Sequence, residues 1–214
     1  MPADRSALFI RNPSSDVIRI MSVSKILVIA GSLRKGSHNV RLATLAAREL
    51  SLAGAEVNHA SLTDYPLPIY DADLAKSSMP PQAQALKQLV CEHRGVFIAS
   101  PEYNASVTPL LKNAIDWIST VRAPDEPMLV AFQNRAFALG AASPGRSGGI
   151  QSLIALRQVL AVGCRALVLP EQVTVANAYE AFDDSGELKD ARLGTQLKTV
   201  VQKLIDHARL LGPI

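Results

Sequence analysis

Nine residues that directly follow a short apolar run carry the side chains best suited to bind an anion. Residues 31–39 read Gly-Ser-Leu-Arg-Lys-Gly-Ser-His-Asn, and they come after the apolar residues 25–30. Small residues let backbone N–H groups converge on a ligand, and a helix that starts here adds partial positive charge at its N-terminus. Arg34 adds a forked, charge-assisted donor. The segment therefore predicts a site for a phosphate-bearing ligand.

The same segment has a purely structural alternative, a strand-to-helix turn capped by Ser37 or Asn39 with Arg34 and Lys35 in solvent. Two well-known phosphate loops are excluded by the spacing. No Gly-Lys-Ser/Thr follows as in a P-loop, and the segment is not Gly-x-Gly-x-x-Gly. These absences argue against a nucleoside triphosphatase and against an ordinary dinucleotide-binding fold.

A second loop with unusual composition, residues 100–106, reads Ser-Pro-Glu-Tyr-Asn-Ala-Ser. Pro101 stiffens the turn, and Tyr103 can lie beside an aromatic ring while backbone groups bind the ring edge. Glu102 is assigned to an ion pair or an interface rather than to catalysis. The alternative is that Tyr103 and Asn104 serve the turn alone.

A third loop, residues 143–149, reads Ser-Pro-Gly-Arg-Ser-Gly-Gly and precedes another helical pattern. Its adjacent glycines permit close approach of the backbone to a ligand. The N–H groups of this loop are suited to stabilising negative charge on a reduced ring. The alternative is a tight surface turn without a ligand.

Apolar strands alternate with amphipathic helices along the chain, which is typical of a parallel sheet with right-handed crossovers. Strands are expected at residues 25–30, 56–62, 95–100, 136–142 and 166–169. Helices are expected at residues 39–53, 81–93, 107–119, 150–162 and 189–211, and residues 63–80 are expected to form a long loop. We predict one α/β domain over residues 24–214, preceded by a flexible extension at residues 1–23 in which Met21 is a candidate natural start.

These elements fit a five-stranded parallel sheet in the order 2-1-3-4-5. In that order a ligand crevice forms at the carboxyl ends of strands 1 and 3, where the connections switch sides of the sheet. The loops at residues 31–39, 100–106 and 143–149 follow strands 1, 3 and 4. We therefore expect these three loops to meet at one place.

Composition and charge exclude several classes of protein. The chain has 214 residues, of which 48% are hydrophobic, and its net charge of +3 comes from scattered basic residues. A nucleic-acid binder usually shows a dense basic stripe with interleaved aromatics, which is missing here. No apolar stretch reaches the ~20 residues that span a bilayer, and no secretory signal is recognised. We expect a cytoplasmic protein that binds neither nucleic acid nor membrane.

The cysteines and histidines show no catalytic or metal-binding spacing. Cys91 and Cys164 are far apart and form no Cys-x-x-Cys motif, so both are expected to be small buried residues in a reducing compartment. The four histidines are scattered, which argues against a metal site. No Ser/His/Asp or paired-carboxylate arrangement is recognised.

At the three loops the chain resembles the NADPH-dependent FMN reductase family, which includes quinone, chromate and azo reductases of flavodoxin-like fold. The resemblance covers about residues 24–205 and is carried by residues 31–39, 100–104 with 111–117, and 140–146. It implies a three-layer sandwich that binds FMN, uses NADPH as co-substrate and forms a homodimer or homotetramer.

The resemblance also implies roles for individual residues. The FMN phosphate would be held by Ser32, Arg34, Ser37, Asn39 and Val40. The isoalloxazine would be flanked by Pro101, Glu102, Tyr103 and Asn104, with Ser143 and Gly145 at its other edge. Three departures from the family pattern stand out, namely Ala105 where many relatives have Gly, Thr108-Pro109 in place of Pro-Gly, and His38 where relatives often carry a bulky apolar residue. No role is assigned to His38.

The implied reaction passes electrons from NADPH through FMN to a small acceptor by a ping-pong mechanism, without a catalytic side chain. The expected acceptor is a quinone, a flavin, an azo compound or a metal oxyanion. One alternative is a flavin-binding electron carrier without NADPH turnover, although flavodoxins are usually acidic with a Thr-rich phosphate loop. Another is a regulatory or hydrolytic phosphate-binding domain without flavin.

Overall fold

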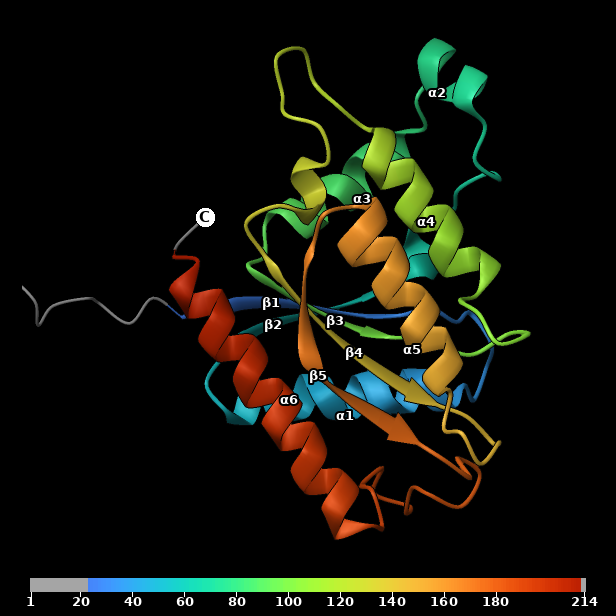
Figure 1. Ribbon diagram of the computed structural model, residues 1–214, viewed down its shortest axis with the longest axis vertical. Coiled ribbons are helices and arrows are strands. Elements are labelled where there is room, and N and C mark those ends of the chain that lie inside the picture. The colour runs from blue at the N-terminus through green and yellow to red at the C-terminus, as the bar shows by residue number, and fades with distance from the viewer. Residues whose placement is uncertain (1–22, 213–214) are drawn as a thin grey trace, which may run out of the picture.

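Five short strands form one parallel sheet at the centre of the structure (Figure 1). The computed structural model describes residues 23–212, so Met21 and nearly all of the predicted N-terminal extension lie outside the described residues. The strands are β1 (Lys25–Ala30), β2 (Glu56–Ser61), β3 (Gly95–Ala99), β4 (Ala136–Ala142) and β5 (Leu167–Val175). Their order is β2-β1-β3-β4-β5, which confirms the predicted topology.

Helices cover both faces of the sheet (Figure 1). The helices are α1 (His38–Leu52), α2 (Ala72–Ser77), α3 (Pro81–Cys91), α4 (Pro109–Thr120), α5 (Ile150–Arg157) and α6 (Ala191–Leu210). One face packs against α1 and α6, and the other packs against α3, α4 and α5. The predicted three-layer sandwich is thus confirmed.

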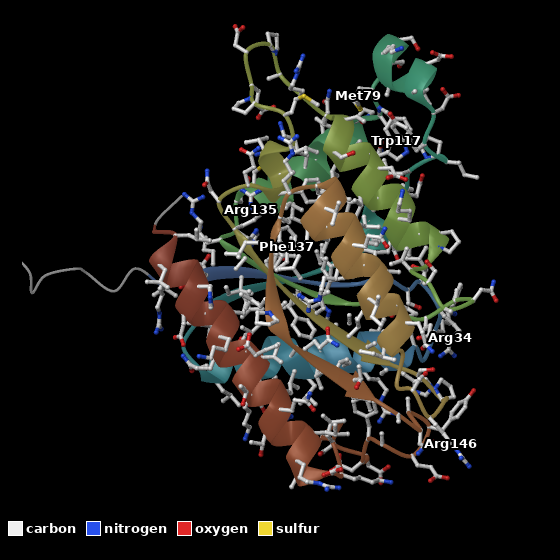
Figure 2. All side chains as sticks on the ribbon, in the orientation of Figure 1. Arg34, Met79, Trp117, Arg135, Phe137 and Arg146 are labelled. Carbon is white, nitrogen blue, oxygen red and sulfur yellow. The ribbon has the colours of Figure 1, made fainter. Side chains whose placement is uncertain are left out.

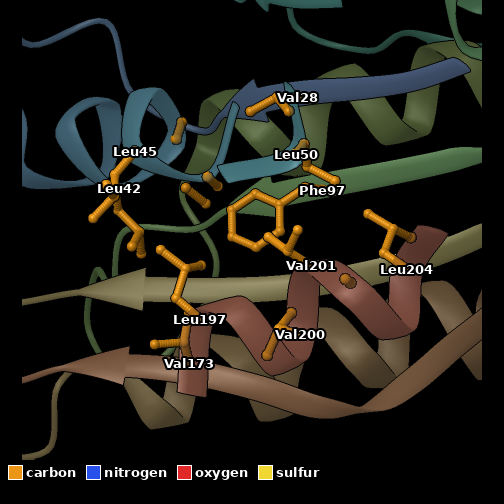
Figure 3. Packing of buried hydrophobic residues seen from close by; sticks show 14 of the residues in the cluster. Val28, Leu42, Leu45, Leu50, Phe97, Val173, Leu197, Val200, Val201 and Leu204 are labelled. Atoms are coloured by element: carbon orange, nitrogen blue, oxygen red, sulfur yellow. The ribbon is translucent and has the colours of Figure 1, made fainter. Parts of the chain in front are cut away.

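The alternation of side chains along each strand explains why both faces are apolar. In β1, Ile26 and Val28 point into the core on the side of α1 and α6, while Leu27 and Ile29 point into the opposite core. Figure 3 shows the first core, where Phe97 of β3 lies between Leu50 of α1 and the leucine and valine side chains of α6. A continuous apolar run buried on both faces is therefore a central strand, as the sequence pattern predicted.

Among the strands and α-helices, three elements differ from the prediction by more than two residues at a boundary or were not predicted at all. Strand β5 extends to Val175 because Pro170 lies in an edge strand at a register shift, between Val168, which pairs with Phe137, and Gln172, which pairs with Leu139. Helix α2 lies inside the predicted loop, and its first turn is capped by the Asp71 carboxylate, which accepts from the N–H groups of Asp73 (2.8 Å) and Leu74 (3.1 Å). Helix α5 is shorter than predicted, because residues Gln158–Gly163 continue it as a π-helical turn.

No helix in residues 23–212 is both long enough and apolar enough to cross a membrane.

Candidate functional site

The three loops of unusual composition meet at the carboxyl ends of β1, β3 and β4, around a cavity of about 330 Å³. In Figure 2, Arg34 of the first loop and Arg146 of the third lie at this end of the sheet, and Arg135, which precedes β4, lies at the other. The cavity is lined by Ser32, Arg34, Ser37, His38, Asn39, Pro101, Glu102, Tyr103, Ala142, Ser143, Pro144 and Tyr179. The predicted convergence of the three loops is therefore seen in the structure.

Most of the residues predicted to bind FMN line this cavity, while three of them do not. Val40, Asn104 and Gly145 neighbour lining residues in the sequence but are not part of the wall. The contacts of all these residues with a ligand stay predictions.

Helix α1 begins at the cavity without a side-chain cap. Ser37 is its N-cap residue, and the Ser37 hydroxyl makes no capping hydrogen bond. The N–H of Arg41 makes the first intrahelical bond, to the carbonyl oxygen of Ser37 at 3.1 Å. The N–H groups of His38, Asn39 and Val40 come before it, so they have no intrahelical acceptor. Together with the helix dipole, they form a site suited to an anion.

Arg34 lies on the first loop with its guanidinium exposed. Its backbone N–H donates to Ser32 Oγ at 3.3 Å, and its Nη2 donates to the carbonyl oxygen of Gly36 at 3.4 Å. This long hydrogen bond to Gly36 uses only one of the five N–H donors of the guanidinium. The guanidinium can therefore turn toward a phosphate at the cavity without losing a strong bond.

Asn39 joins the first loop to the end of β4. Its side-chain Nδ2 donates to the carbonyl oxygen of Ala142 at 2.8 Å, and the Ala142 N–H donates to Asn39 Oδ1 at 2.9 Å. The side chain is buried, so both bonds are made away from water. The amide of Asn39 therefore positions two loops, and what this residue offers to a ligand is its backbone N–H.

Thr108 joins the second loop to the first. Its hydroxyl donates to the carbonyl oxygen of Gly31 at 2.9 Å and accepts from the N–H of Leu111 at 3.2 Å, so it also caps α4. Pro109 then occupies the first helical position, where its missing N–H has no cost. The Thr-Pro departure from the family pattern thus has a structural reason.

Glu102 joins the second loop to the third, because its Oε2 accepts from the N–H groups of Gln151 (3.0 Å) and Ser152 (3.3 Å) at the start of α5. This carboxylate compensates the positive end of α5, whereas α1 has no such partner. Of the helices that follow the first and third loops, α1 is therefore the one that favours an anionic ligand. The Glu102 carboxylate, which was expected in an ion pair or at an interface, thus binds backbone N–H groups of helix α5 in its own chain.

Comparison with known proteins identifies the family of this chain. The sequence profile of NADPH-dependent FMN reductases matches residues 24–180. The chain belongs to this family. It is 34% identical over 181 residues to the NAD(P)H-dependent FMN reductase of Pseudomonas aeruginosa, covering 84% of this chain and 92% of the relative. It is 35% identical over 190 residues to an NAD(P)H:quinone oxidoreductase of Solanum tuberosum, covering 85% and 91%.

The solved structure of a similar flavoenzyme confirms the fold. The flavoenzyme NAD(P)H:acceptor oxidoreductase FerB of Paracoccus denitrificans matches with a TM-score of 0.71 and 26% identity, over 88% of this chain and 98% of that one. The chain is therefore an oxidoreductase of the FMN reductase family, with FMN as cofactor and NAD(P)H as electron donor. The resemblance inferred from the three loops is confirmed.

The third loop of this reductase needs glycine at two positions. Gly148 and Gly149 have φ of +63° and +88°, in the left-handed region that disfavours other residues. A Cβ on Gly149 would also lie 2.8 Å from the Cβ of Ala141. These two residues therefore let the third loop turn sharply from β4 into α5 beside the cavity.

The second loop ends in a two-residue turn that is strained in this reductase. Tyr103 and Ser106 exchange backbone hydrogen bonds of 3.0 Å each, and the intervening Asn104 and Ala105 have φ of 50° and 59°. This is the geometry of a type I′ turn, in which glycine is preferred at the second central position. The family departure at Ala105 therefore places an alanine in a left-handed conformation.

Replacing Ala105 with glycine is expected to stabilise the protein by about 1 kcal/mol, because glycine adopts the left-handed conformation without strain. Urea unfolding of both proteins would measure this difference in the free energy of unfolding. Ala47→Gly, within helix α1, is the matched control and should destabilise by about 1 kcal/mol. A loss of stability in Ala105→Gly as large as in the control would contradict the assignment of strain.

The sequence assigned no role to four of the lining residues, namely Ala142, Pro144, His38 and Tyr179. His38 is buried and meets the ring of Tyr179 edge to face, with ring centroids 4.8 Å apart at 89°. Tyr179 belongs to the segment between β5 and α6, which carries no recognisable loop motif, so only the folded chain shows that it reaches the cavity. For His38, the sequence offered one signal of a functional role, namely that this residue departs from the family pattern.

The cysteines play no part in this site. Cys164 is buried, and burial raises the pKa of its thiol to about 11, which keeps it protonated and unreactive. Both cysteines of the chain are free. No group of three or more His, Cys, Asp and Glu side chains in residues 23–212 is arranged to hold a metal ion.

Proposed function

We propose that this reductase passes electrons from NADPH through FMN to a small acceptor, such as a quinone, a flavin, an azo compound or a metal oxyanion, by a ping-pong mechanism. The observation that carries the proposal is the cavity at the carboxyl ends of β1, β3 and β4, where one helix N-terminus is left without a cap. FMN, when bound, supplies the redox chemistry by accepting hydride and passing electrons on.

The residues present fit FMN, because the cavity holds Arg34 and the uncapped start of α1 together with the exposed ring of Tyr103. The phosphate would be bound by Ser32, Arg34, Ser37, Asn39 and Val40 through side chains and the N–H groups of α1. The ring system would be flanked by Pro101, Glu102, Tyr103 and Asn104, with Ser143 and Gly145 at its far edge. No side chain has to act as a general acid or base, so the work of the protein is positioning and charge compensation.

Steady-state kinetics with NADPH and a quinone test the proposal. Because donor and acceptor would use the same open face in turn, double-reciprocal plots at several quinone concentrations should be parallel. Intersecting lines would contradict the ping-pong mechanism while leaving the reductase activity in place. If NADPH were not consumed in the presence of any acceptor, the chain would be an electron carrier instead.

The assembly and location of the protein are part of the same proposal. We propose a homodimer or homotetramer, because Tyr103 in the wall of the cavity and Leu33 on the first loop leave about half of their surface exposed, at 52% and 53%. We also propose a cytoplasmic location, which agrees with two unpaired cysteines.

A further inference from the structure

The imidazole of His38 is buried at the start of α1, and neither of its ring nitrogens has a hydrogen-bond partner among the described residues. Only 7% of the residue surface is exposed. The other buried histidine, His93, differs because its Nδ1 lies 2.7 Å from the carbonyl oxygen of Leu89. Buried polar groups without partners are rare and costly. His38 is also in the wall of the cavity, where a ligand can supply the missing partner.

The groups around His38 favour the neutral form of its ring. Burial lowers its pKa most, and the positive charges of Arg34 on the first loop and Arg41 on α1 lower it further. From the segment between β5 and α6, the ring of Tyr179 packs edge to face against it. Arg41 itself lies over the ring of Phe182, 4.7 Å from its centroid, on the same segment. The surroundings of His38 thus contain positive charge and aromatic rings.

A phosphate at the N-terminus of α1 would instead favour the protonated form of the His38 ring. His38 is the first helical residue, so its ring extends from the same turn that presents N–H groups to the cavity. A dianionic phosphate beside it would supply both a negative charge and hydrogen-bond acceptors, each of which favours the protonated ring. It would also offset the charges of Arg34 and Arg41.

We propose that His38 is a further cofactor-binding residue, which donates a hydrogen bond to the phosphate of FMN and takes up one proton from solvent when FMN binds. The binding reaction is then apoprotein plus FMN dianion plus one proton, giving the complex, with no other bond made or broken. FMN affinity consequently falls as pH rises through the pKa of His38 in the complex. Because the proposal rests on the phosphate lying at α1, its test must separate the two claims.

Calorimetric titration of the FMN-free protein with FMN, in two buffers with different ionisation enthalpies, measures the protons taken up. At about pH 7.5 FMN is already dianionic, since phosphate monoesters have a second pKa near 6. We expect the wild-type protein to take up close to one proton and His38→Phe to take up about none. The phenylalanine keeps an aromatic ring against Tyr179. His207→Phe, on α6, is the matched control and should behave as wild type.

Affinity gives a second readout. At about pH 7, His38→Phe should bind FMN roughly tenfold more weakly than wild type, the effect of one hydrogen bond to a charged group. The difference in FMN affinity between the two proteins should shrink toward pH 9. Riboflavin, which lacks the phosphate, should bind both proteins with equal affinity. If His38→Phe fails to fold, nitrogen NMR of the wild-type protein replaces it, and FMN should convert the His38 ring from neutral to protonated.

The outcomes distinguish the two claims. Equal proton uptake and equal FMN affinity in wild type and His38→Phe would overturn the role of His38 while leaving the phosphate site intact. A His38 ring that stays neutral in the FMN complex would do the same. Binding of riboflavin as tightly as FMN by wild type would instead overturn the phosphate site itself.

Discussion

Replacing Arg34 with alanine is expected to weaken FMN binding by about 1–3 kcal/mol, or roughly 5- to 150-fold, the range for a hydrogen bond to a charged group. Arg34 lines the cavity next to the uncapped start of α1, and the one hydrogen bond that its guanidinium makes within residues 23–212 is long, at 3.4 Å. Most of its binding capacity is therefore available to a phosphate. Quenching of flavin fluorescence during titration of the FMN-free protein measures the affinity.

Three comparisons make this result specific. Arg34→Lys should recover part of the affinity, since it keeps the charge but not the fork. Arg122→Ala removes an exposed arginine just beyond α4 and should change nothing. Riboflavin should bind wild type and Arg34→Ala alike. Unchanged FMN affinity in Arg34→Ala would show that this residue does not bind the phosphate.

Replacing Asn39 with alanine is expected to lower the free energy of unfolding by about 2–4 kcal/mol, because each unsatisfied buried group costs about 1–3 kcal/mol. The substitution removes both partners of Ala142, at 2.8 and 2.9 Å, in a buried place that water cannot easily fill. It also frees the first loop from β4, so FMN binding should weaken as well. Urea unfolding measures the change in stability, provided that the free energy of unfolding falls with urea concentration at the same slope in both proteins.

Asn39→Asp separates the structural role from the binding role. It retains an acceptor for the N–H of Ala142 but loses the donor, and it places a negative charge where the phosphate is expected. Stability should be intermediate, while FMN binding should fall further than in Asn39→Ala. Asn58→Ala, at an exposed site on β2, is the control and should stay within about 0.5 kcal/mol of wild type. Full stability in Asn39→Ala would contradict the link between the two loops.

The sheet and the meeting of the loops were predictable because they depend on local patterns. A continuous apolar run such as residues 25–30 identifies a central parallel strand, and strand order then places the ends of β1, β3 and β4 together. Helix α2 was missed because its six residues carry too short a pattern, and its cap, Asp71, lies among prolines. The length of β5 was missed because Pro170 usually ends a strand and does not do so at an edge.

The bonds that hold the site together were not predictable, because each joins residues far apart in the sequence. Asn39 was assigned to the phosphate, yet its side chain binds Ala142, 103 positions away. Thr108 was noted only as a departure from the family pattern, yet it holds the first loop through Gly31. Tyr179 lies in a segment with no periodicity or motif. Such contacts follow from tertiary structure alone, and they decide which groups remain for the ligand.

We propose that the loops after β1, β3 and β4 form one FMN site whose phosphate end is the N-terminus of α1. A crystal structure of the protein with FMN tests this claim most directly. We predict that the phosphate lies against the N–H groups of residues 38–40 beside Arg34, with the ring system between Tyr103 and Ser143. A flavin bound elsewhere, or with its phosphate at the start of α5, would contradict this account.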